Sequence, residues 1–328
     1  MDNIAALSHD KRRELFQEAS AKRGMSEAIM EKDFWVCWTL LHLFEHPELS
    51  SKILFKGGTS LSKAFHLIDR FSEDIDLVLD WTLLTDEDPN ADRSRKQQKL
   101  FNEDLIQKSQ TYIRDFVKGW VEDLTGELCK VSIDEEHGGV ILIKYPEVFK
   151  DKYLRSEVRL EIGPRSDWIP HGEYKVVPYA AEVFPEQFKV SEAQVVAIKA
   201  ERTFWEKATI LHQEAFRPDD KMPPLRYSRH YYDLAFMSRS AIKENALKDV
   251  HLLGKVIEFN QRFFPSTWAR YELARPGSMK LMPPHYVEKV LRDDYAAMEQ
   301  MIFGEYPSFE DILKEIKNLE DQINGLHL

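Results

Sequence analysis

Residues 53–79 read ILFKGGTSLSKAFHLIDRFSEDIDLVL, and this stretch decides the fold. It opens with a short apolar run at residues 53–55 that ends in two glycines. A helix-like segment follows at residues 59–69, and residues 75–79 then alternate as a strand does. The stretch therefore predicts a strand, a tight turn, a helix and a second strand in succession.

The glycine turn is a candidate phosphate site. Gly57 and Gly58 lie where a strand gives way to a helix, so exposed backbone and free helix amides meet at one point. Thr59 and Ser60 add hydroxyl donors, and Lys63, one turn after Thr59, can lie near the same helix end. Such a turn alone also fits a helix start that binds no ligand.

Two aspartates follow on the second strand. Asp74 and Asp76 are two residues apart, so their carboxylates project from the same face. Paired carboxylates with open positions for phosphate oxygens suit Mg²⁺, and Mn²⁺ has similar ligand preferences. The alternative is a solvated strand edge, although the apolar alternation of Ile75, Leu77 and Leu79 indicates packing on the other face.

A third carboxylate would complete a site for two metal ions. Glu161 is the preferred candidate, because it lies on the polar face of an expected strand and next to residues 163–164, Gly-Pro, where that strand ends. Glu157 shares this face and is the competitor. Either glutamate could instead pair with Arg155 or Arg159.

The rest of the chain predicts a helical beginning, a β-rich middle and a helical end. Ser8 and Ser26 read as N-caps of two helices. Residues 93–124 read as one long helix whose apolar side includes Leu100, Leu105, Tyr112 and Phe116. Further strands are expected at residues 127–133, 140–145, 156–162 and 174–177, and from residue 191 onward the pattern is helical.

Composition limits the class of protein. No apolar stretch is long enough to cross a bilayer and no signal-peptide pattern is present, so we expect a cytoplasmic protein without a membrane partner. Cys37 and Cys129 lack metal-site or redox spacing and are expected to be buried thiols. A net charge of −11 argues against a general nucleic-acid coat protein but allows a local basic stripe.

Taken together, the glycine turn, the aspartate pair and the later carboxylate follow the pattern of the DNA polymerase β-like nucleotidyltransferase superfamily. The sequence of residues 56–63 and 70–77 resembles the AbiEii/AbiGii toxin nucleotidyltransferases in particular. Residues 31–35, EKDFW, are similar to that family's N-terminal helix. The resemblance continues, with gaps, through residues 161–166, 178–185, 200–212 and 229–234, about two-thirds of the chain in all.

The resemblance implies an α+β fold with three parts. Residues 51–188 would form a nucleotidyltransferase core, with a mixed sheet and flanking helices. Residues 1–50 would be a helical section packed on this catalytic lobe, and residues 189–328 an α-helical C-terminal lobe.

The resemblance also implies roles for individual residues. Gly58 and Ser60 would belong to the nucleotide loop, Asp74 and Asp76 to the metal pair, and Glu161 to the third acidic position, which is often Asp in relatives. Lys207 would bind the triphosphate, and Asp233 would be a site residue. The residues alone suggest less: Lys207 could be a surface lysine on an amphipathic helix, and Asp233 could pair with Arg229.

The implied function is transfer of an NMP from an NTP to an acceptor, an RNA and in particular a tRNA 3′ end. The chain would act as the toxin of a bacterial toxin–antitoxin or phage-defence system, with a cognate antitoxin. A protein hydroxyl or a small molecule could replace RNA as the acceptor, and an inactive binding protein of the same fold is the third hypothesis. Candidate RNA contacts, which a solvated helix face explains equally well, are Arg93, Arg95, Lys96, Arg226 and Arg229.

Ser72 is a candidate regulatory residue. It stands two residues before Asp74 and would share its face if the strand began that early. A phosphate there would add negative charge beside the carboxylates. The alternative is that Ser72 only caps the turn after Phe71.

Overall fold

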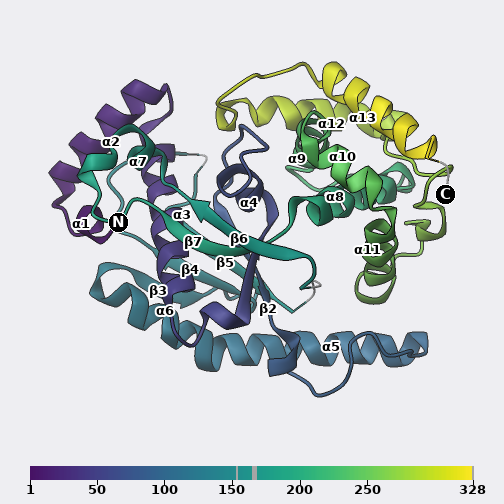
Figure 1. Ribbon diagram of the computed structural model, residues 1–328, viewed down its shortest axis with the longest axis horizontal. Helices are drawn as coiled ribbons and strands as arrows, with labels where there is room; N and C mark the ends of the chain where they lie inside the picture. The colour runs from purple at the N-terminus through teal and green to yellow at the C-terminus, as the bar shows by residue number, and fades with distance from the viewer. Residues whose placement is uncertain (153, 165–167, 327–328) are drawn as a thin grey trace. The chain divides into compact units, whose positions relative to one another are not determined.

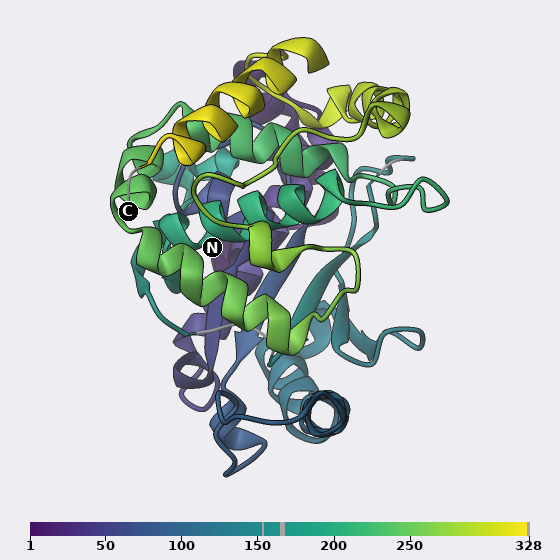
Figure 2. The same cartoon turned by 90° about the vertical axis from the view of Figure 1, so that its right-hand side faces the viewer.

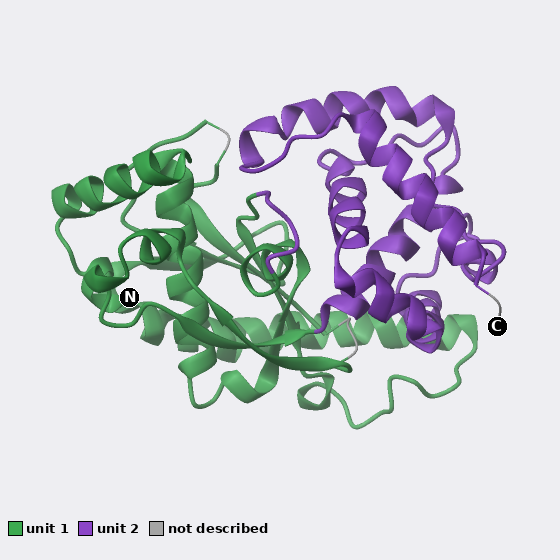
Figure 3. Cartoon of the chain, turned by 45° about the horizontal axis from the view of Figure 1, so that its top comes forward, with its two compact units in different colours: residues 1–65, 71–198 green, residues 66–70, 199–328 purple. Residues whose placement is uncertain are grey.

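The structure is a computed structural model that describes residues 1–152, 154–164 and 168–326 (Figure 1). The chain divides into two compact units (Figure 3). Unit 1 comprises Met1–Phe65 and Phe71–Ile198, and unit 2 comprises His66–Arg70 and Lys199–Leu328. The chain thus leaves unit 1 at His66, returns to it at Phe71 and leaves it again after Ile198.

A seven-stranded mixed sheet forms the centre of unit 1, in the order β3-β4-β5-β2-β1-β7-β6. The strands are β1 (Ile53–Lys56), β2 (Asp74–Leu79), β3 (Lys130–Ile133), β4 (Val140–Lys144), β5 (Glu157–Gly163), β6 (His171–Val176) and β7 (Ala193–Ile198). The middle strand β2 runs antiparallel to β1 and parallel to β5. This sheet, with its flanking helices and the helical second unit, confirms the predicted α+β class.

Unit 1 also contains seven α-helices in its described residues, which precede β1 or lie between the strands along the chain. They are α1 (Asp2–Ala5), α2 (His9–Arg23), α3 (Glu27–Glu45), α4 (Gly57–Lys63), α5 (Arg95–Tyr112), α6 (Lys118–Thr125) and α7 (Tyr179–Val183). The predicted N-caps are confirmed, because the Ser8 and Ser26 hydroxyls accept hydrogen bonds from the amides of Lys11 and Ile29. Helix α3 packs on β7 and is buried along most of its length.

The predicted long helix has two corrections. A π-helix, Ile113–Val117, joins α5 to α6, so residues 95–125 run continuously but with a shift in the packed face. Leu105 is buried as expected, whereas Leu100 and Phe116 are 56% and 51% exposed. The assignment of these two side chains to the apolar face was wrong; Leu105 packs inward together with Phe101 instead.

Two further expectations differ from the structure. The helix expected at residues 59–69 ends at Lys63, and His66 shortly afterwards has a φ of +52°, which no helix accommodates. The segment after residue 191 is not all helical, because β7 pairs with β6 and β1. Three of its six residues, Val195, Val196 and Ile198, are β-branched and favour a strand, a signal that the helical prediction overlooked.

Unit 2 consists of helices with α8 and α9 at its centre (Figure 2). The helices are α8 (Ala200–Ala215), α9 (Ser228–Ser238), α10 (Ala241–Lys248), α11 (Val250–Phe263), α12 (His285–Ala297) and α13 (Phe309–Asn324). α8 packs against α9, α10 and α11, while α9 also packs against α12 and α13. The segment His66–Arg70 joins this unit through a backbone bridge between Arg70 and Ile302.

Two smaller predictions concern burial and membranes. Cys37 and Cys129 are buried free thiols, as predicted. Within the described ranges, no helix combines the length and the apolar character that crossing a bilayer requires.

Candidate functional site

The glycine turn brings β1 directly into α4, whose first two residues are Gly57 and Gly58. Gly57 has a φ of +81°, a conformation that side-chain-bearing residues rarely adopt. A Cβ atom at this position would lie 1.9 Å from Oδ2 of Asp76. The Asp76 carboxylate is therefore packed against the glycine backbone, and only glycine leaves it room.

We expect Gly57→Ala to lower the free energy of unfolding by about 2–4 kcal/mol. A left-handed backbone accounts for roughly 1–2 kcal/mol of this loss and overpacking for the rest. Gly24→Ala is the matched control, because Gly24 has a φ of +70° with no atom within 4 Å of an added Cβ. Urea denaturation of both variants measures the difference, and equal losses would mean that the contact with Asp76 is unimportant.

The polar side chains of α4 are engaged inside the protein. The hydroxyl of Thr59 donates to the main-chain oxygen of Asp74, and that of Ser60 to the main-chain oxygen of Gly57 at 2.8 Å. Both residues are fully buried. The Thr59 bond ties α4 to the start of β2, and the Ser60 bond stays within the first turn of α4, so both hydroxyls stabilise the turn itself.

Lys63 lies in the core of unit 1. Its ammonium group is 2.8 Å from the carboxylate of Asp33 and lies over the ring of Tyr179, and both members of the ion pair are buried. The sequence predicts Lys63 near the start of α4, as a candidate nucleotide ligand. In the structure its ammonium group is held by the Asp33 carboxylate.

Asp74 and Asp76 share one face of β2, as the alternating burial of the strand shows. The parallel register places Asp74 beside Arg159 and Asp76 beside Glu161 on β5. Glu161 is therefore the direct neighbour of the aspartate pair. Glu157, the competing candidate, lies before the first residue of β5 that pairs with β2, and its main-chain oxygen accepts a hydrogen bond from Lys32.

Burial sets the electrostatics of Asp74. Its Oδ1 atom is buried and accepts no hydrogen bond from the residues that the structure describes. Burial raises the pKa of the Asp74 carboxyl, and the neighbouring Glu161 and Glu73 raise it further. A nearby cation would favour the charged form of this carboxyl.

Arg159 lies among three carboxylates. Its Nη1 donates to Asp134 Oδ2 at 2.8 Å, while its Nε is 4.0 Å from Asp74 Oδ1 and 3.7 Å from Glu161 Oε1. The bond from Arg159 lowers the pKa of Asp134 to about 2. Across residues 1–152, 154–164 and 168–326, no three Asp, Glu, His or Cys side chains are arranged to hold a metal ion.

Three buried charged residues of α3, residues 31–33, hold backbone segments of unit 1 in place, including the start of β5. Each side chain fixes a separate backbone segment: Glu31 binds the amides of Val148 and Phe149, Lys32 the carbonyls of Arg155 and Glu157, and Asp33 the amide of Tyr179. Lys32 also lies 3.7 Å from Glu73, the residue before Asp74. The EKD stretch is visible in the sequence as a family resemblance, but its contacts with the segments around β2 and β5 join residues too distant in the chain to predict.

Unit 2 holds its own buried ion cluster around Asp233. Arg70 donates from Nε and Nη2 to the two carboxylate oxygens at 2.6 and 2.8 Å, and the Lys207 ammonium lies at 2.7 Å. All three side chains are buried, so Lys207 is not a surface lysine. The suggested pairing of Asp233 with Arg229 is replaced by these two contacts, and Arg70 is a member that sequence analysis missed.

The candidate RNA contacts and Ser72 are exposed or half-buried. Arg93 pairs with Glu87 and lies over the ring of Phe101, while Arg95 and Lys96 are exposed at the start of α5. In unit 2, Arg226 is exposed and Arg229 half-buried. Ser72 is half-buried and precedes β2, so the strand does not begin early enough to include it.

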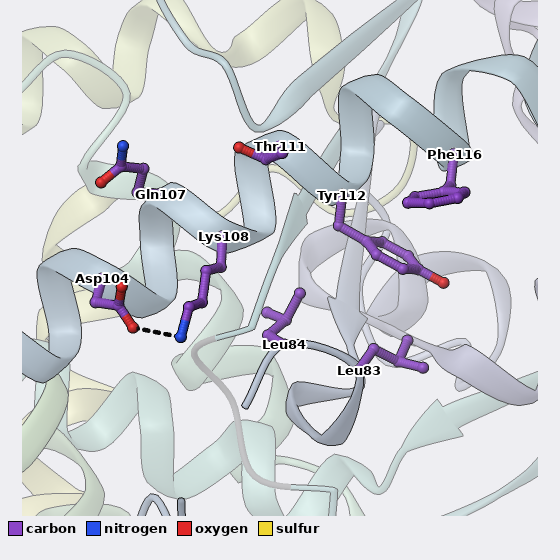
Figure 4. Close-up of a pocket in the computed structure, with 8 residues that line it drawn as sticks. All are labelled: Leu83, Leu84, Asp104, Gln107, Lys108, Thr111, Tyr112 and Phe116. Atoms are coloured by element: carbon purple, nitrogen blue, oxygen red, sulfur yellow. Dashed lines mark ion pairs between the residues drawn. The ribbon is translucent and has the colours of Figure 1, made fainter. Parts of the chain in front are cut away.

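A pocket of about 450 Å³ lies along α5 (Figure 4). Leu83 and Leu84 line it together with Tyr112 and Phe116, and the Asp104–Lys108 ion pair of 2.8 Å spans one end. None of the predicted site residues is among those that line it. We therefore place the candidate site on β2, β5 and the glycine turn.

Comparisons with known proteins identify the family of the chain. The model of the nucleotidyl transferase AbiEii toxins, from type IV toxin–antitoxin systems, matches residues 38–315. Among solved structures, MenT4, a nucleotidyltransferase toxin from Mycobacterium tuberculosis H37Rv, is similar with 14% identity and a TM-score of 0.46, covering 98% of this chain and 100% of that one. A suspected nucleotidyltransferase from H. pylori is similar with 14% identity and a TM-score of 0.45, covering 92% and 96%.

No curated protein matches the sequence. The family match, however, spans most of the chain and includes the glycine turn, the aspartate pair, Glu161, Lys207 and Asp233. The resemblance read from the sequence is thereby confirmed. The chain belongs to the family of AbiEii nucleotidyl transferase toxins of type IV toxin–antitoxin systems.

Proposed function

We propose that this chain transfers an NMP from an NTP to the 3′ end of an RNA, tRNA in particular, and that this transfer is its toxic activity. The observation that carries the proposal is the shared face of β2 and β5. There Asp74, Asp76 and Glu161 are neighbours in register, and Asp76 is packed against the Gly57 turn. The proposed setting is the cytoplasm, in phage defence or another toxin–antitoxin role with a cognate antitoxin.

The carboxylates fit a divalent cation, Mg²⁺ or Mn²⁺. Asp74 offers a buried oxygen that accepts no hydrogen bond from the described residues, and Asp76 projects from the same face. We propose that these two residues hold the metal and that Glu161 completes a site for two ions. Bound there, the metal would neutralise triphosphate charge and polarise the acceptor hydroxyl.

The chain's own groups would orient the nucleotide. The first amides of a helix have no partner within the helix, and we assign those of Gly57 and Gly58 to the triphosphate. The hydroxyls of Thr59 and Ser60 would keep this turn in shape through their backbone bonds. Lys207 is proposed as a triphosphate ligand, with Asp233 as the residue that holds it.

A labelled transfer assay tests the proposal. The purified chain is incubated with Mg²⁺, each of the four labelled NTPs in turn, and either total RNA or total protein as the acceptor. Label on RNA of tRNA size supports the proposal. Label on protein or on a small molecule would change the acceptor, and absence of transfer to any acceptor would favour an inactive binding protein.

Phosphorylation of Ser72 is proposed to silence the enzyme. We expect Ser72→Glu to remove most of the transfer activity and Ser72→Ala to have little effect, because added negative charge beside Asp74 would repel the triphosphate. The transfer assay measures both variants. If Ser72 only caps the turn, Ser72→Ala will instead lower the melting temperature, and full activity of Ser72→Glu would exclude the regulatory role.

A further inference from the structure

The acidic face contains a positive charge of its own. Asp74 and Asp76 on β2 stand beside Arg159 and Glu161 on β5, so the four side chains form a two-by-two grid on one face of the sheet. Arg159 occupies the corner next to both Asp74 and Glu161. Its Nε atom lies within ion-pair distance of both of these carboxylates, to which we assign the metal.

Arg159 is bonded to only one of its three acidic neighbours. At 2.8 Å its Nη1 makes a direct hydrogen bond to Asp134, which follows β3. The distances of 4.0 and 3.7 Å from Nε to Asp74 and Glu161 are too long for hydrogen bonds, although they are short enough for charge attraction. The hydrogen bond to Asp134 thus holds the guanidinium near Asp74 and Glu161, but the guanidinium makes no hydrogen bond to either of these two carboxylates.

The atoms that face each other across this gap are both unsatisfied. Arg159 Nε and Asp74 Oδ1 are buried, and neither has a hydrogen-bond partner among the described residues. Unsatisfied buried polar atoms destabilise a fold, so their retention calls for an explanation. A cation between Asp74 and Glu161 would satisfy the carboxylates, but it would also meet the positive charge of Arg159.

We propose that Arg159, anchored by Asp134, is a built-in counter-ion of the acidic face that competes with the divalent cation for Asp74 and Glu161. In the metal-free chain it screens the repulsion between the carboxylates. When the metal binds, the guanidinium keeps its hydrogen bond to Asp134, and the metal replaces it as the counter-charge of Asp74 and Glu161. Arg159 is thus a positioning residue that tunes metal affinity, and the inference rests on the proposed metal site.

The test measures Mn²⁺ binding to the full chain by titration calorimetry, with the free ion followed by electron paramagnetic resonance. Arg159→Gln should tighten Mn²⁺ binding by about tenfold or more, because a unit charge about 4 Å from the ligands is removed. Asp134→Asn should weaken binding severalfold, because the released guanidinium can bond directly to Asp74 and Glu161. Both variants lose the ion pair between Arg159 and Asp134. If that pair were only structural, the Mn²⁺ affinity of both variants would change in the same direction, whereas the proposal predicts opposite changes.

Arg23→Gln is the matched control, because it removes an arginine that is paired with Glu182 elsewhere in unit 1; its Mn²⁺ affinity should equal that of the wild type. Asp76→Asn in the Arg159→Gln background should abolish binding, which assigns the ion to this face. Unchanged or weaker binding by folded Arg159→Gln overturns the inference and leaves the proposed function intact. If Arg159→Gln does not fold, unchanged affinity of Asp134→Asn overturns it, and absence of Mn²⁺ binding by both wild type and Arg159→Gln overturns the metal site itself.

Discussion

Asp76→Asn should reduce nucleotidyl transfer by at least about a hundredfold while the protein stays folded. The loss follows from removing a negative charge that would hold the metal where charge develops during the reaction. Asparagine has nearly the same size as aspartate, so the close packing against Gly57 is retained. Transfer of labelled NMP, measured with saturating NTP and Mg²⁺, gives the rate, and circular dichroism gives the melting temperature.

The control for this substitution is Asp10→Asn. Asp10 lies on α2, and its side chain is 92% exposed, so the same chemical change there should leave both rate and stability unaltered. Full activity in a well-folded Asp76→Asn protein would remove Asp76 from the metal site. A large fall in melting temperature would instead assign the residue to the fold of the turn.

Local patterns made the centre of this fold predictable. The glycines, the alternation of β2 and the serine caps of α2 and α3 each depend on residues only a few positions apart, and the structure has them all. The shared face of Asp74 and Asp76 follows from the two-residue period of any strand. Glu161 was preferred over Glu157 because it lies close to the end of its strand, and the register places it beside Asp76.

Pairing between distant segments was not predictable in this way. β7 lies between β1 and β6, and although its valines and isoleucine favour a strand, no local pattern shows which strands are its neighbours. The position of Arg159 beside Asp74 depends on the register between β2 and β5, which a shift of one residue would reverse. Arg70 lies 163 residues before Asp233, and no spacing rule links the two.

Asp233→Asn is expected to have the largest effect on stability, lowering the free energy of unfolding of unit 2 by about 3–5 kcal/mol. The carboxylate is completely buried and neutralises two buried cations, Arg70 and Lys207. Asparagine keeps the shape of the side chain but leaves both positive charges without a counter-ion. Urea denaturation measures the global loss, and hydrogen exchange of the α9 amides reports the loss within unit 2.

The effect of Asp233→Asn should also depend on pH. Burial alone would raise the pKa of Asp233, but the charges and hydrogen bonds of Arg70 and Lys207 outweigh it and hold this pKa well below its usual value. The stabilisation is then complete above the unfolded pKa of about 3.9 and is lost as the pH falls further towards the folded pKa. The difference in the free energy of unfolding between wild type and Asp233→Asn should therefore be constant from neutral pH to about pH 5 and shrink below about pH 4.

Glu310→Gln, which breaks the exposed pair with Arg292 in the same unit, should change the free energy of unfolding by less than about 1 kcal/mol at any pH. A loss in Asp233→Asn no larger than in this control would mean that the cluster contributes little to the fold of unit 2.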